Sequence, residues 1–148
     1  MKRLALLIVA VVLVAGCGGS SRMSKASYEQ TLQTDGKAVQ SALTSLSKSP
    51  PTTLAQLTKR IDTIETVVKK MADDLSSLKP PAEADADNTA IVAGLRRIQS
   101  GAEKVKSNPA AAPTIVTAIQ NSPQLKAADK AIADLKSTGY KVGVLGIP

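Results

Sequence analysis

The fold class is decided by residues 54–78, LAQLTKRIDTIETVVKKMADDLSSL. Apolar side chains recur in this segment at alternating steps of three and four residues: Leu54, Leu57, Ile61, Ile64, Val68, Met71, Leu75 and Leu78. This spacing places them on one face of an α-helix and is typical of a helix in a bundle or a coiled coil. A β-strand would need an apolar residue at every second position, and this segment does not meet that requirement.

Local signals predict where this helix begins and ends. Thr53 is followed three residues later by Gln56, a spacing that is typical of a capping box at a helix N-terminus. Pro80 and Pro81 cannot continue a helix, so we expect the helix to stop before them.

Two further segments carry the same kind of pattern. One runs over about 24–47, and the other over about 82–106. Their apolar stripes are Tyr28, Leu32, Val39, Leu43 and Leu46 in the first, and Ala84, Ile91, Leu95, Ile98, Ala102 and Val105 in the second. Both segments are predicted to be amphipathic helices.

The fourth segment is less regular because Pro123 interrupts it. Its apolar face is formed by Ile115, Val116, Ile119, Leu125, Ala128, Ile132 and Leu135. Ser122 as N-cap with Pro123 at the first helical position predicts that a new helix begins there. The alternative is a single helix that is kinked at Pro123. Gly139 is expected to cap the end.

None of these helices can bury its stripe alone, so the four segments must share one core. We therefore predict an all-α fold, an antiparallel up-down-up-down four-helix bundle over residues 24–139. The fourth helix is expected to be broken or kinked near Pro123.

The composition argues against several function classes. The 148 residues include no histidine, one cysteine and only two aromatic residues, both tyrosines. Histidine is the usual general base and the commonest metal ligand, and stacking platforms for nucleic acids need aromatic faces. We therefore expect a protein that is not an enzyme, with no catalytic residue, metal, cofactor or nucleic-acid partner. The net charge of +7 is scattered, which favours a solvated face over a patch for anionic lipids or polymers.

The first 16 residues have the pattern of a signal peptide. Lys2 and Arg3 precede an unbroken apolar run over 4–15. A helix that spans a membrane needs about 20 apolar residues, so this run is too short to do so.

The end of this leader, Val14-Ala15-Gly16-Cys17, resembles the lipobox of bacterial lipoproteins. The resemblance implies cleavage between Gly16 and Cys17 and a diacylglyceryl group on the Cys17 thiol. The partner of Cys17 would then be membrane lipid, on the extracytoplasmic face of the cell membrane. In the family, aspartate directly after the cysteine is linked with retention in the inner membrane. This position holds Gly18, so sorting to the outer membrane would be permitted in a diderm bacterium. An ordinary secreted protein cut near Ala15 is the alternative.

Outside the bundle, residues 17–23 are expected to form a flexible tether between lipid and domain. The tail over 140–148 is apolar and interrupted by glycine. It has two interpretations: it folds back to cover an open seam of the bundle, or it is an extended peptide for a partner. The turn over 78–83, LKPPAE, is similar to that of small helical envelope lipoproteins of unassigned function.

Two polar residues interrupt the apolar stripes and are candidate ligand contacts. Asp35 interrupts the stripe of the first helical segment and Asn88 that of the third. Asp87 is the alternative to Asn88 at this position of the third stripe. They could meet across the bundle and line a small pocket, or they could set the register of the helices.

Together these patterns predict a lipid-anchored, non-enzymatic interaction or structural module of the bacterial envelope. Its partner would be an envelope protein or an anionic polymer. The alternative is a lipoprotein that binds a small ligand between its helices.

Overall fold

The computed structural model describes residues 21–48 and 51–143, although the side chains of residues 46–48, including Leu46 of the predicted stripe, lie outside the described part. The described residues form helices and no β-strand, which confirms the all-α prediction. The helices are α1 (Lys25–Lys48), α2 (Leu54–Ser77), α3 (Asp85–Ser107), α4 (Ala112–Gln120) and α5 (Pro123–Ser137), with the short 3-10 turns η1 (Ala82–Ala84) and η2 (Pro109–Ala111) before α3 and α4.

The capping residue predicted for α2 is in place. The Thr53 hydroxyl accepts a hydrogen bond from the Gln56 backbone N–H at 3.2 Å. The Gln56 side chain reaches back one residue further than expected and accepts from the Thr52 N–H at 2.9 Å. Both bonds satisfy donors that a helix N-terminus would otherwise leave unpaired.

The fourth segment is broken into two helices at Pro123. The Ser122 hydroxyl caps α5 by accepting from the Leu125 N–H at 3.3 Å, and Pro123 begins the helix. At its other end Gly139 has a positive φ of 78°, and the Tyr140 N–H donates to the Leu135 carbonyl at 2.9 Å. This is the Schellman pattern that a glycine after a helix makes available.

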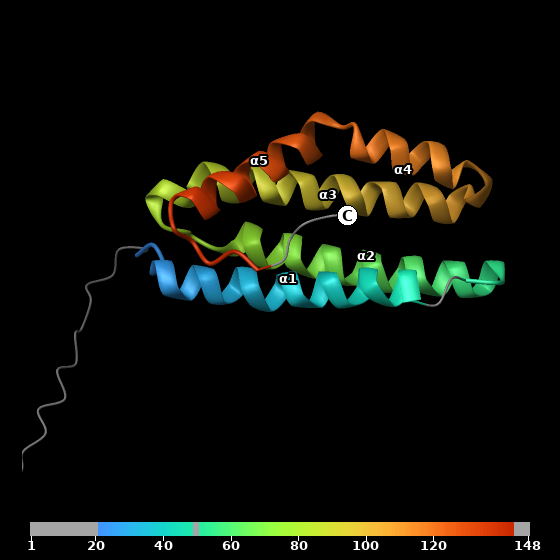
Figure 1. Ribbon diagram of the computed structural model, residues 1–148, viewed down its shortest axis with the longest axis horizontal. Coiled ribbons are helices and arrows are strands. Elements are labelled where there is room, and N and C mark those ends of the chain that lie inside the picture. Colours follow the sequence, from blue (N-terminus) through green and yellow to red (C-terminus); the bar gives the residue numbers. More distant parts are fainter. Residues whose placement is uncertain (1–20, 49–50, 144–148) are drawn as a thin grey trace, which may run out of the picture.

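The helices pack in sequence order (Figure 1). α1 lies against α2 in a helical hairpin, α2 packs on α3, and α3 packs on both α4 and α5. The core comes from both ends of the sequence and includes Tyr28, Leu32, Val68, Met71, Leu75, Ile91, Leu95, Ala131, Leu135 and Tyr140.

Two glycines of α3 allow its close contact with α4 and α5. A Cβ on Gly94 would lie 2.5 Å from the Ala128 Cβ, and a Cβ on Gly101 would lie 2.1 Å from the Ile119 side chain. The Ala128 Cβ cannot move without its backbone, so Gly94 sets how closely α3 approaches α5, whereas a side chain at Gly101 would require the Ile119 side chain to shift.

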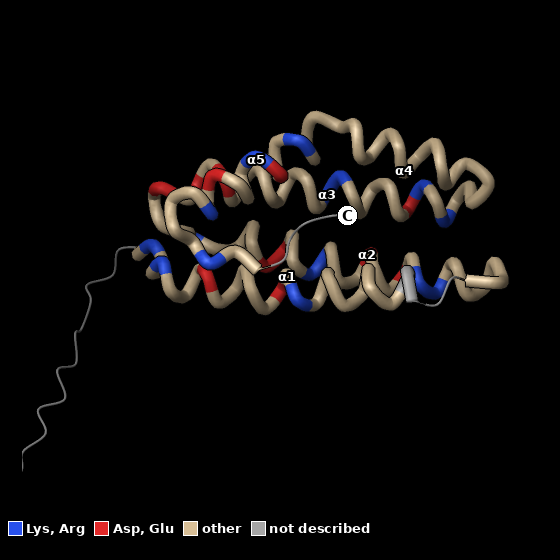
Figure 2. Tube along the Cα trace, viewed as in Figure 1, with Lys and Arg blue, Asp and Glu red and all other residues tan. Residues whose placement is uncertain are grey.

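Helix α4 differs from the other helices because it carries no charged residue and buries none of its residues (Figure 2). Val116 is 45% exposed, while Ile115 and Ile119 are half-buried. This uncharged helix with exposed apolar side chains is held chiefly by its contacts with α3.

The folded domain starts earlier than predicted. Arg22 and Met23 were expected to belong to the tether, but both contact the turn between α2 and α3. The Met23 N–H donates to the Lys79 carbonyl at 2.8 Å, and Arg22 donates to the Pro80 carbonyl at 3.0 Å and pairs with Asp85 at 2.9 Å. Satisfying these carbonyls holds residues 22–23 on the domain.

Candidate functional site

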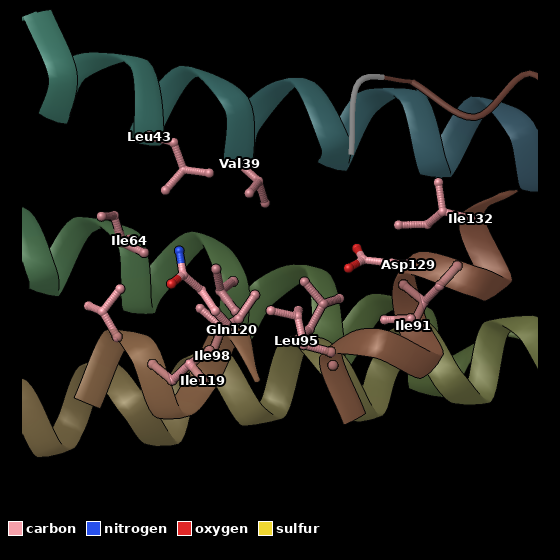
Figure 3. A pocket seen from close by; sticks show the side chains of 15 residues that line it. Val39, Leu43, Ile64, Ile91, Leu95, Ile98, Ile119, Gln120, Asp129 and Ile132 are labelled. Carbon is pink, nitrogen blue, oxygen red and sulfur yellow. The ribbon is translucent and has the colours of Figure 1, made fainter. Parts of the chain in front are cut away.

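An apolar groove lies between the α1–α2 hairpin and the layer formed by α3, α4 and α5 (Figure 3). Its volume is about 290 Å³. Thirteen of its fifteen lining residues are apolar, and the side chains that line it include Val39, Leu43, Ile64, Ile98, Ile119 and Ile132. The groove is the candidate functional site because small-molecule and peptide sites are concave and mostly apolar.

The groove exists because the two sides of the molecule pack unequally. Gly94 and Ala128 let α5 approach α3 closely, whereas α1 packs chiefly on α2. Val39 and Leu43 of α1 therefore point into the groove, toward the side lined by Ile98 and Ile119 (Figure 3). The break at Pro123 adds to this gap because α4 is a separate helix that packs on α3.

The chemistry of the groove is that of a hydrocarbon surface. Its only polar lining residues, Gln120 and Asp129, are both exposed. Apolar walls favour an apolar occupant at roughly 25 cal/mol for each Å² removed from water. The two polar residues could orient such an occupant by hydrogen bonding.

Asn88, one helical turn before the groove residue Ile91 in α3, is part of a buried hydrogen-bond network. The Tyr28 hydroxyl donates to its Oδ1 at 3.0 Å, and its Nδ2 donates to the Leu75 carbonyl at 3.0 Å. Because burial disfavours the phenolate, the pKa of Tyr28 is raised well above its usual range. Asn88 thus links α1, α2 and α3 through its own side chain.

Asp35 has different partners from Asn88. Its carboxylate lies 3.8 Å from the Lys70 ammonium, and its Oδ2 has no hydrogen-bond partner among the described residues. Burial raises the pKa of Asp35, the Lys70 charge opposes this rise, and Asp74 adds to it. The structure therefore does not join Asp35 and Asn88 into one site, and neither residue lines the groove.

The predicted lipidation and cleavage residues, Cys17 and Gly16, lie outside the described residues, as do residues 144–148 of the tail. The described part of the tail, residues 140–143, lies along α1. The Gln33 side chain donates to the Lys141 carbonyl at 3.1 Å.

Most groove residues belong to the apolar stripes found in the sequence, but their role as a lining was not predicted. Hydrophobic periodicity shows which face of a helix is apolar and does not show how far away the next helix lies. The missed signals are Gly94 and Gly101, which are seven residues apart and so share a face of α3, and the uncharged run over 108–125.

No protein-family model, curated protein or solved structure matches the chain. Within residues 21–48 and 51–143, no helix is long and apolar enough to cross a membrane. In the same part of the chain, no group of three or more cysteine, aspartate or glutamate side chains could hold a metal ion.

Proposed function

We propose that this chain is a lipid-anchored, extracytoplasmic, non-enzymatic module of the bacterial envelope that binds a partner through its apolar groove. The support for the anchor is Val14-Ala15-Gly16-Cys17, which resembles a lipobox and follows a basic start and a short apolar run. The observation that carries the binding role is the groove itself, with its thirteen apolar lining residues. The partner in this proposal is an envelope protein with an apolar segment.

The proposal also assigns the helices to an up-down-up-down four-helix bundle in which α4 and α5 together form the fourth helix. The support is the packing order, since each long helix lies against the next one in the sequence. In this arrangement the groove is the seam between the first and fourth helices, where a bundle would otherwise close.

A chemical role for the anchor follows from its energetics. Each buried methylene contributes about 0.8 kcal/mol, so one acyl chain binds a membrane marginally and two or three bind it durably. Acylated Cys17 would hold the domain at the membrane surface, because few residues separate it from Arg22, which is bonded to the Pro80 carbonyl.

The anchor is tested by fractionating cells that produce Cys17→Ser and, as a matched control, Ser20→Ala. Cys17→Ser should lose the lipid modification seen by mass spectrometry and leave the membrane fraction, while Ser20→Ala should keep both. Membrane attachment of Cys17→Ser, or an unmodified thiol in the native product, would contradict the anchor.

A second candidate function is the binding of a small apolar ligand, and the hydrocarbon-like lining of the groove favours it. A ligand that binds only the folded state raises its melting temperature by mass action. A series of fatty acids of increasing length should therefore raise the melting temperature of the full chain if this function holds. Leu43→Asp should remove the rise, whereas Ser41→Asp, on the exposed face of α1, should keep it.

A further inference from the structure

The seam between α1 and α5 is filled at one end by the chain that follows α5. The Lys25 ammonium donates to the Thr138 carbonyl at 3.2 Å and lies 4.2 Å from the centre of the Tyr140 ring. The Lys141 N–H then donates to the Glu29 carboxylate at 3.1 Å. The tail therefore advances along α1 in the direction from Lys25 toward Gln33.

Gly143, the last residue of the tail that the structure describes, lies close to α1. A Cβ on Gly143 would lie 3.3 Å from the Cα of Gln33. Val142, one residue earlier, packs against the hydrophobic core. The tail is thus directed along α1 and held in contact with it at Gln33.

The groove lies further along the same helix. Val39 and Leu43 are six and ten residues beyond Gln33, and Leu43 is about 15 Å further along the helix axis. Five residues remain after Gly143, and extended they span about 17 Å. The remaining chain is therefore long enough to reach Leu43.

The remaining residues also match the groove chemically. They are Val-Leu-Gly-Ile-Pro, without a charged side chain, and the groove offers apolar side chains from all five helices. We propose that residues 144–148 continue along α1 and insert Leu145 and Ile147 into the groove, which makes the tail an intramolecular plug. A partner would have to displace this plug before it could bind.

This inference goes beyond the proposed function, because the plug can form whether or not Cys17 is acylated. It concerns only the occupant of the groove. A fractionation result that contradicts the anchor would not bear on the plug, and the experiments below do not test the anchor.

The position of the tail is tested by disulfide formation in the full chain carrying Cys17→Ser, so that the introduced cysteines are the only thiols. Ile147→Cys is paired with Leu43→Cys in the groove or with Ser41→Cys. Ser41 is exposed and lies about 200° around α1 from Leu43. Under oxidised glutathione the Leu43 pair should form an intramolecular disulfide at least about tenfold faster. Equal rates, or a disulfide between two copies, would overturn the proposal.

Access to the groove is tested with a fluorescent fatty acid as probe. Ile147→Asp should expel the plug and tighten probe binding by about tenfold or more relative to the unsubstituted full chain. Lys141→Ser is the matched control: it changes the net charge by the same amount, and its hydrogen bonds come from its backbone. Probe binding that is equally tight in all three chains, or absent from all three, would overturn the proposal.

Discussion

The two ends of the helices are held together in different ways. At one end, which we call the tyrosine end, Tyr28 and Tyr140 pack edge to face with ring centroids 6.0 Å apart. The Tyr28 hydroxyl is bound by Asn88, and the Tyr140 hydroxyl donates to Glu83 at 2.8 Å. Burial and this hydrogen bond raise the pKa of Tyr140 to about 12. Aromatic packing and satisfied polar groups define a single arrangement there.

The other end, the groove end, contains α4 and the halves of α1 and α2 that face it. Its polar contacts between helices lie at the surface: Lys106 of α3 pairs with Asp62 and Glu65 of α2, and Arg60 donates to the Ser45 carbonyl of α1. Helix α4 buries no residue. Val39, Leu43 and Ile64, which line the groove there, are half-buried. The comparison teaches that the same four helical stripes produce a closed core where buried polar groups fix the spacing, and an open groove where the polar contacts lie at the surface.

The largest expected effect comes from truncating the centre of the tyrosine end. Tyr28 is fully buried. Tyr28→Ala should lower the free energy of unfolding by about 3–5 kcal/mol because it leaves a large cavity. Val116→Ala, at the exposed surface of α4, should cost less than about 1 kcal/mol. Urea unfolding followed by circular dichroism measures both, and equal losses would remove the distinction between the two ends.

Removing Asn88 sharpens the same comparison. Asn88→Ala leaves the Tyr28 hydroxyl without its partner and removes the side-chain donor to the Leu75 carbonyl, which should cost about 1–3 kcal/mol. Combining it with Tyr28→Phe should cost less than the sum of the two single changes, because both remove the same bond. Strict additivity in this double-mutant cycle would show that the Tyr28–Asn88 bond contributes nothing. Asn121→Ala, at an exposed position, is the control.

Overpacking the contact between α3 and α5 tests why the groove forms on one side only. Gly94→Ala should destabilise the fold by about 1–2 kcal/mol, because the added methyl group would lie 2.5 Å from the Ala128 Cβ. Adding Ala128→Gly should recover part of this loss in the same urea titration. A neutral Gly94→Ala would mean that α3 and α5 are not in close contact.

The smallest effect is expected at Asp35, and it depends on pH. The folded-state pKa of Asp35 is raised, so the folded state binds protons more strongly than the unfolded state. Its favourable contribution is therefore present in acid and is lost as the pH rises through the folded-state pKa.

Asp35→Asn should accordingly stabilise the protein at pH 7 by about 1 kcal/mol, and this gain should vanish in acid. Asp129→Asn, an exposed carboxylate at the groove, is the matched control and should show little change. Thermal unfolding across the acid-to-neutral range measures both variants. A gain for Asp35→Asn that does not depend on pH would contradict the assignment.

The helices and their ends were predictable because local chemistry sets them. The three-and-four spacing over 54–78 predicted α2, and Thr53, Ser122 and Gly139 each cap the helix end at which the sequence placed them. Each of these signals acts within one turn of helix, so it can be read from neighbouring residues alone.

The candidate site was not predictable to the same degree, because it depends on distances between helices. The sequence marked Asn88 as a polar interruption, but its partner Tyr28 is 60 residues away, and the pairing makes it a structural contact. Val39 and Leu43 were predicted as core residues. Whether such residues close against a neighbour or line a gap depends on small residues elsewhere, here Gly94.

Hydrogen–deuterium exchange of the full chain tests the central claim, the difference between the two ends, most directly. Amides of α2 around Met71 and Leu75, at the tyrosine end, should exchange at least about 100-fold more slowly than amides of α4 around Val116. Protection that is uniform across α2 and α4, or greater in α4, would contradict it.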